Sequence, residues 1–236
     1  MGWLVSIALT LPVYIGAGFC AIATLLVLLW RNKQGEKQDA VSTNESYPPG
    51  CDPRVLLASR ITLFAGCMGF GVVRILFPKL GQHLGWADRE IAQTIAFFLG
   101  GVAFSLLVSN LWPWWRGKFW PQPVAQGLML LSGMVAVSTS SRIVLEAAFF
   151  VVGIVLALAN TASLYHGLSG RKQRGKNTGI HESLIAGGVV VECLIGGVLA
   201  QIFSPRAPFA LFSALSALSL VATITIYYTM RNKADV

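Results

Sequence analysis

The chain has 236 residues, of which 55% are hydrophobic and only 12% are charged. Average soluble domains carry about twice that charged fraction. The composition therefore excludes a soluble domain and predicts an integral membrane protein, and the net charge of +8 indicates a positive-inside topology rather than a nucleic-acid partner.

Seven apolar segments are each long enough to cross a bilayer, which takes about 20 residues. The first, 3–30, is too long for the core of a signal peptide and lacks a basic lead-in. The polar, proline-rich segment 32–53 reads as a linker, and Asp52-Pro53 is typical of a helix cap and first turn. The remaining predicted helices are 54–78, 87–110, 121–140, 142–167, 177–203 and 206–230.

Lysine and arginine are unevenly divided between the predicted loops, with thirteen on one side and four on the other. This bias predicts an outside N-terminus, a cytoplasmic linker and a cytoplasmic C-terminus. We therefore expect a multi-pass protein of the plasma (inner) membrane, surrounded by the lipid bilayer. The tryptophans agree, because all fall at predicted helix ends, where an aromatic belt forms: Trp3, Trp30, Trp86, Trp112, Trp114, Trp115 and Trp120.

Seven helices with an outside N-terminus also fit two receptor classes, and the sequence argues against both. A microbial rhodopsin needs a lysine in its last helix, but 207–230 contains none. The D-R-Y and N-P-x-x-Y motifs of G-protein-coupled receptors are absent.

Catalytic and metal-binding patterns are also missing from the sequence. There is no Ser-His-Asp arrangement, phosphate loop or metal-ligand spacing. The four cysteines form no C-x-x-C pair and read as packing residues: Cys20, Cys51, Cys67 and Cys193. We expect no enzyme, no metal and no cofactor.

The stretch 174–200 places two carboxylates in a glycine-rich apolar helix. Glu182 lies near its predicted start, and Glu192 lies about 15 Å further along the axis, near the middle of a hydrocarbon core about 30 Å thick. Glu192 is either a protonatable site in a transport path or a neutral carboxyl group facing a partner helix or another subunit. Four glycines allow a second backbone to approach this helix: Gly187, Gly188, Gly196 and Gly197.

A basic loop, then Gly179-Ile180-His181-Glu182, and finally Gly196-Gly197 resemble the penultimate helix of major facilitator superfamily transporters. That helix often follows a basic loop, continues as G-(I/L)-x-E and ends in a G-P-x-x-G-G-like run. At 192–193 this chain has Glu-Cys in place of the common Gly-Pro.

The resemblance implies an all-α membrane fold with seven transmembrane helices. Residues 54–236 would form a six-helix bundle like the C-terminal half of such a transporter, built from inverted three-helix repeats 54–140 and 142–230. The helix in 1–31 and the linker 32–53 would correspond to the family's sixth helix and central cytoplasmic loop.

Other polar residues have both functional and structural interpretations. Asn160, deep in the fifth predicted helix, binds a substrate or a neighbouring helix. Arg74 binds an anion or a carboxylate, or snorkels to the outer interface. His181 and Glu182 lie at the inner mouth of the sixth helix. The resemblance implies a gate role for both residues, whereas the structural interpretation is capping of the first turn by Glu182 or its pairing with Arg174 or Lys176 in the loop.

The tryptophan-rich segment 110–123 occupies the place of the family's Asp-containing basic loop. Arg116-Gly117-Lys118 weakly resembles the basic part of that loop, so we assign Arg116 and Lys118 to the inner gate. The aromatic residues fit an interfacial anchor or a protein-docking surface better.

Two functions remain open at this stage. The first is a half-sized transporter of a small solute, which needs a second half from another membrane protein or a second copy. The alternative is a non-transporting structural or assembly subunit of a larger membrane complex. In both cases we expect the surface with Gly188 and Glu192 to face the centre of the path or a partner chain that covers it.

Overall fold

The computed structural model describes residues 52–169 and 174–232, and all regular structure in these ranges is helical. The predicted helix 3–30 and nearly all of the linker 32–53 lie outside the described residues. The helices are α2 (Pro53–Gly71), α3 (Phe77–His83), α4 (Asp88–Leu111), α5 (Pro121–Ser138), α6 (Arg142–Leu168), α7 (Arg174–Val191), α8 (Gly197–Ile202) and α9 (Ala207–Asn232), with two π-helical segments, η1 (Val72–Leu76) and η2 (Glu192–Gly196).

Five of the described helical runs are long and apolar enough to cross a membrane, which indicates a multi-pass membrane protein. One run joins α2, η1 and α3, and another joins α7, η2 and α8. The five runs are Pro53–His83, Asp88–Leu111, Arg142–Leu168, Arg174–Ile202 and Ala207–Thr229. The 18-residue helix α5 is not among them, because two prolines and two glutamines lie in its first six residues.

Two predicted helix ends are wrong. The helix expected to stop at residue 78 continues to His83. Pro78 has no N–H group to donate, and the helix enters this region through η1, whose wider turn is closed by the Phe77 N–H donating to the Val72 carbonyl. The helix expected from residue 177 begins at Arg174, because its polar first turn extends beyond the apolar segment.

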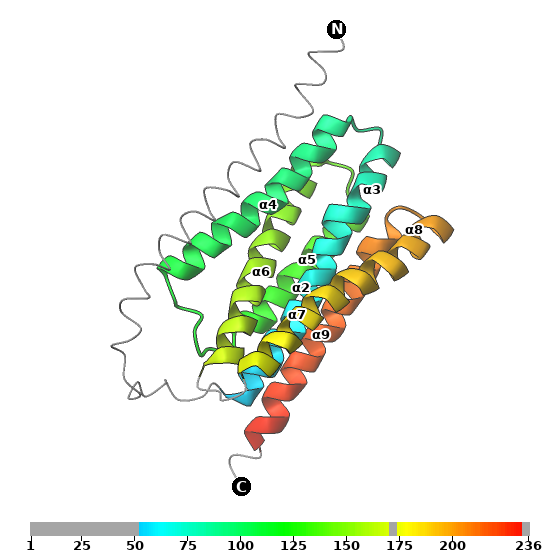
Figure 1. Ribbon diagram of the computed structural model, residues 1–236. Helices are drawn as coiled ribbons and strands as arrows, with labels where there is room; N and C mark the ends of the chain where they lie inside the picture. The colour runs from blue at the N-terminus through cyan, green and yellow to red at the C-terminus, as the bar shows by residue number, and fades with distance from the viewer. Residues whose placement is uncertain (1–51, 170–173, 233–236) are drawn as a thin grey trace. The chain divides into compact units, whose positions relative to one another are not determined.

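Helix α2 lies at the centre of the described bundle and packs against α5, α6, α7 and α9 (Figure 1). Helix α4 lies at one side, where it packs on α6, and α5 pairs with α9. Aromatic residues fill the core between these helices. Phe149 of α6 packs edge-to-face on Phe77 at a centroid distance of 5.0 Å and stacks on Phe209 of α9 at 5.8 Å.

Helices α4 and α6 cross at close range. Gly101 of α4 lies against the carbonyl of Phe150, and Gly153 of α6 lies against the carbonyl of Phe98. A methyl group on either glycine would overlap the facing backbone. These two helices therefore meet backbone to backbone, as small residues allow in membrane proteins.

Candidate functional site

Glu192 is the first residue of η2, and its side chain is 0% exposed. Two glycines leave it room. A Cβ atom on Gly71 would lie 3.2 Å from the Glu192 Cβ, and one on Gly196 would lie 2.7 Å from the Glu192 Oε1. Neither carboxylate oxygen has a hydrogen-bond partner among the described residues. The site is therefore a carboxyl group enclosed by close-packed helices.

The two π-helical segments meet at this carboxyl group. η1 packs on η2, and both contact α9. A π turn is rare and often lies at a functional site. η2 begins at the Glu192-Cys193 pair, so this helix leaves α-helical bonding there without a proline.

The sequence-based prediction that Glu192 faces protein rather than lipid is confirmed. Within the described residues, α2 of the same chain packs on this surface. Gly188, one turn before Glu192, is buried, and a Cβ there would lie 2.7 Å from the carbonyl oxygen of Phe64 and 2.8 Å from the Cβ of Cys67.

Arg74 lies in η1 but is exposed, and its guanidinium packs over the Phe70 ring at 5.3 Å from the ring centroid. It makes no ion pair with Glu192, although both belong to the two π-helical segments. Asn160 on α6 is half-buried, and its Oδ1 atom has no hydrogen-bond partner in the described part of the chain. Leu156, one turn earlier, packs on Gly66 of α2, which places Asn160 at the α2–α6 interface.

A second buried polar cluster, which the sequence did not single out, joins three helices. Gln126 of α5 donates from Nε2 to the hydroxyls of Thr62 on α2 and Thr223 on α9, both at 2.9 Å. All three side chains are 0% exposed. Thr62 donates its own proton to the Ala58 carbonyl, so it accepts from Gln126. A glutamine inside a predicted membrane span was the available signal.

Replacing Gln126 with leucine is expected to lower the free energy of unfolding by about 1–2 kcal/mol, because interhelical hydrogen bonds in membranes each contribute about 0.6–1.7 kcal/mol. Denaturant unfolding of the purified protein in detergent measures this loss. Thr223→Val should show part of it, whereas Thr225→Val, on an exposed residue of the same helix, should show none. Equal losses for the two threonine variants would contradict the assignment.

The residues assigned to the inner gate do not form one cluster. His181 is 3% exposed, and its Nδ1 lies 3.1 Å from the Ser163 hydroxyl of α6. Glu182 is exposed. Because α7 begins at Arg174, Glu182 is more than two turns into the helix, and its expected capping of the first turn is wrong. Asn177, which the sequence analysis missed, accepts from the Arg60 Nη2 at 2.8 Å.

The tryptophan-rich loop between α4 and α5 is anchored by Trp115. This residue is 2% exposed, and its indole N–H donates to the Ser109 carbonyl at 3.1 Å. Its ring packs edge-to-face on Tyr165 of α6, because the loop folds back over the helix ends. Arg116 covers Tyr165 at 5.2 Å from the ring centroid, and Lys118 is exposed.

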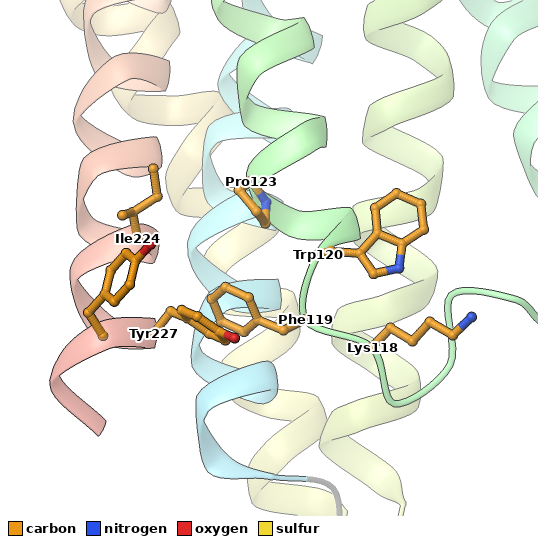
Figure 2. Close-up of a pocket in the computed structure, with 7 residues that line it drawn as sticks. Lys118, Phe119, Trp120, Pro123, Ile224 and Tyr227 are labelled. Atoms are coloured by element: carbon orange, nitrogen blue, oxygen red, sulfur yellow. The ribbon is translucent and has the colours of Figure 1, made fainter. Parts of the chain in front are cut away.

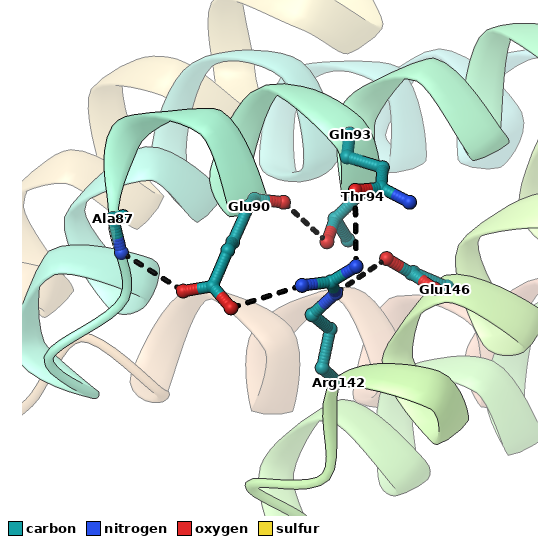
Figure 3. Close-up of polar contacts among 6 residues, drawn as sticks. All are labelled: Ala87, Glu90, Gln93, Thr94, Arg142 and Glu146. Atoms are coloured by element: carbon teal, nitrogen blue, oxygen red, sulfur yellow. Dashed lines mark hydrogen bonds and ion pairs between the residues drawn. The ribbon is translucent and has the colours of Figure 1, made fainter.

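At the opposite end of the bundle, Arg142 ties α6 to α4 (Figure 3). Its guanidinium donates to Glu146 at 2.9 Å, to Glu90 at 2.9 Å and to Gln93 at 3.0 Å. No sequence pattern assigned a role to Arg142 beyond its charge, or any role to its acceptors. Glu90 and Gln93 lie one turn apart on α4, and Glu146 lies one turn after Arg142 on α6, so only the fold brings the two helices' groups together.

Within residues 52–169 and 174–232, no group of three or more His, Cys, Asp and Glu side chains is arranged to hold a metal ion. Comparison with protein-family models and with curated protein sequences gives no match for this chain.

Proposed function

We propose that this chain is a transporter-type membrane protein that moves a small solute, with Glu192 as the protonatable group of its path. The observation that carries the proposal is a fully buried, unpartnered carboxyl group between two π-helical segments. Loss of its proton would leave an uncompensated charge in an apolar site within the membrane-spanning region, which is costly. Water or a cation must then enter, or η1 and η2 must separate. Proton binding would thereby favour the closed packing described here.

The proposal includes an architecture of two inverted repeats like one half of a major facilitator transporter. The first repeat would hold the α2–α3 run, α4 and α5, and the second would hold α6, the α7–α8 run and α9. In this arrangement α2 corresponds to α6, α4 to α7 and α5 to α9. The contact of α2 with α7 then has its counterpart in the contact of α6 with α4. The α2–α6 and α5–α9 contacts each join two corresponding helices. This correspondence of helix contacts supports the repeat arrangement.

The six described helical runs would make one wall of a path that lies between two halves. We therefore propose that a second copy or another membrane protein supplies the other wall. The charge bias supports a cytoplasmic location for the loop 112–120 and for both ends of the 32–53 linker, and an outside location for the N-terminus, in the inner membrane.

Glu192→Gln tests this function. The variant is expected to fold, because glutamine has nearly the same size and no charge. In the wild type, infrared difference spectra between acid and alkaline pH should contain the C=O band of a buried carboxylic acid, and Glu192→Gln should abolish that band. Glu182→Gln, on an exposed residue of the same helix, should keep it. In liposomes, uptake of candidate solutes should lose its pH dependence only in Glu192→Gln.

Unchanged uptake at every pH would remove Glu192 from the mechanism. Absence of the band from the wild-type spectrum would contradict a titrating carboxyl group at this site.

One observation favours a non-transporting structural subunit as the second candidate. At the end of α4, Leu111 is 74% exposed and Trp112 is 73% exposed, next to a loop that Trp115 holds in place. An apolar surface held in one conformation in this way would support a stable interface with another subunit. Purification of a stable stoichiometric complex that gives no solute flux in liposomes would favour this function over transport.

A further inference from the structure

An open pocket of about 590 Å³ lies between the start of α5 and the end of α9 (Figure 2). This volume is within the range of about 300–1,000 Å³ that is usual for ligand pockets. The loop before α5 and the first residues of α5 form one wall, and the last turns of α9 form the other. The lining residues are Lys118, Phe119, Trp120, Pro123, Ile224, Tyr227 and Tyr228.

The walls of this pocket are apolar and aromatic, although they are open to the surroundings. The Phe119 ring packs on Tyr227 at a centroid distance of 4.8 Å, and Trp120 stacks on Trp114 at 5.2 Å. Trp120 is nevertheless 49% exposed, and Tyr228 is 60% exposed. Tryptophan and tyrosine at the ends of membrane helices lie at the level of the lipid headgroups. The pocket therefore opens where an acyl chain meets its headgroup.

The charge at the pocket edge is positive. Lys118 is exposed and belongs to none of the ion pairs found among the described residues. A smaller cavity of about 220 Å³ shares Phe119 and Tyr227 with the pocket, and Arg54 on its wall is paired with Asp52 at 2.9 Å. Lys118 is thus an uncompensated cation beside an aromatic, apolar groove.

We propose that this groove binds an anionic phospholipid of the surrounding bilayer, with the phosphate at Lys118 and an acyl chain against Trp120, Pro123 and Ile224. A cation at the edge of a cleft between membrane helices attracts anionic headgroups, and the apolar walls receive a chain that already lies at this depth. The proposal does not depend on whether the protein transports.

Native mass spectrometry of the full-length protein in detergent, with phosphatidylglycerol or phosphatidylcholine added, tests the proposal. The wild type is expected to retain phosphatidylglycerol in preference to phosphatidylcholine. Lys118→Gln should weaken phosphatidylglycerol binding about fivefold, the effect of one lysine near a membrane surface. Lys79→Gln, an exposed lysine on α3, should leave binding unchanged.

A second variant tests the chain-binding part of the groove without touching the charge. Ile224→Trp should fill the groove and reduce binding of phosphatidylglycerol, whereas Leu218→Trp, on an exposed residue of α9 outside the pocket, should not. Equal retention of the two lipids, or an equal effect of Lys79→Gln and Lys118→Gln, would overturn the proposal. So would full lipid binding by Ile224→Trp, or a protein chain cross-linked stoichiometrically to this groove in place of lipid.

Discussion

Replacing Gly101 with alanine is expected to lower the free energy of unfolding by about 2–3 kcal/mol, the upper part of the range for overpacked sites. Alanine is a better helix former than glycine by about 1 kcal/mol, so helix propensity opposes this loss. The loss arises because a Cβ at this position would overlap the Phe150 carbonyl of α6. That atom is backbone, and no side-chain rotation can relieve the contact, so α4 and α6 must move apart.

Gly100 provides a matched control for this prediction because it precedes Gly101 in the same helix. A Cβ on Gly100 would meet only the edge of the Phe150 ring, at 3.9 Å, which is ordinary van der Waals contact. Gly100→Ala is therefore expected to be neutral or mildly stabilising in detergent unfolding experiments. If both alanine variants lose stability equally, the close crossing of α4 and α6 is not what Gly101 provides.

Helix positions were largely predictable because membrane-spanning length and hydropathy are local properties of the sequence. The predicted helix 87–110 differs from α4 (Asp88–Leu111) by one residue at each end, and 142–167 differs from α6 (Arg142–Leu168) by one residue at its C-terminal end. The errors arose where helices extend past the apolar region, as in the first turn of α7, or continue through Pro78 by way of a π turn. Hydropathy carries no signal for either event.

The candidate site was predictable only in part. A carboxylate inside an apolar run is unusual enough to single out Glu192 from the sequence alone. Its surroundings were not predictable, because Gly71 and Gly196 matter only through the packing of the α2–α3 run on the α7–α8 run. The same limit applies to Gln126, whose two hydrogen-bond partners are 64 and 97 residues away in the sequence.

Burial of neighbouring tryptophans was also not predictable, since Trp112, Trp114 and Trp115 look equivalent in the sequence. The first is 73% exposed, the second 38% and the third 2%. The difference arises because the loop turns back over α6, with Gly117 at a φ of +70° completing the turn. A left-handed residue of this kind is readily supplied by glycine.

Trp115→Ala is accordingly expected to lower the free energy of unfolding by about 3 kcal/mol or more, the usual loss for truncating a buried aromatic residue. The substitution removes the packing on Tyr165 and His166 and leaves the Ser109 carbonyl without its indole donor. Because Trp115 holds the loop to α6, the change should also free the loop locally. Trypsin should then cleave faster after Arg116 and Lys118, both of which are exposed.

Trp112→Ala is the control for this prediction, because it removes the same side chain from an exposed position of the same loop. We expect it to change neither the unfolding free energy nor the rate of cleavage at Arg116 and Lys118. Trp115→Phe should retain much of the stability, since the ring still packs on Tyr165, but should lose the contribution of the hydrogen bond to Ser109, which is about 0.5–1.5 kcal/mol. Equal sensitivity of the two alanine variants to trypsin would mean that the loop is held by something other than Trp115.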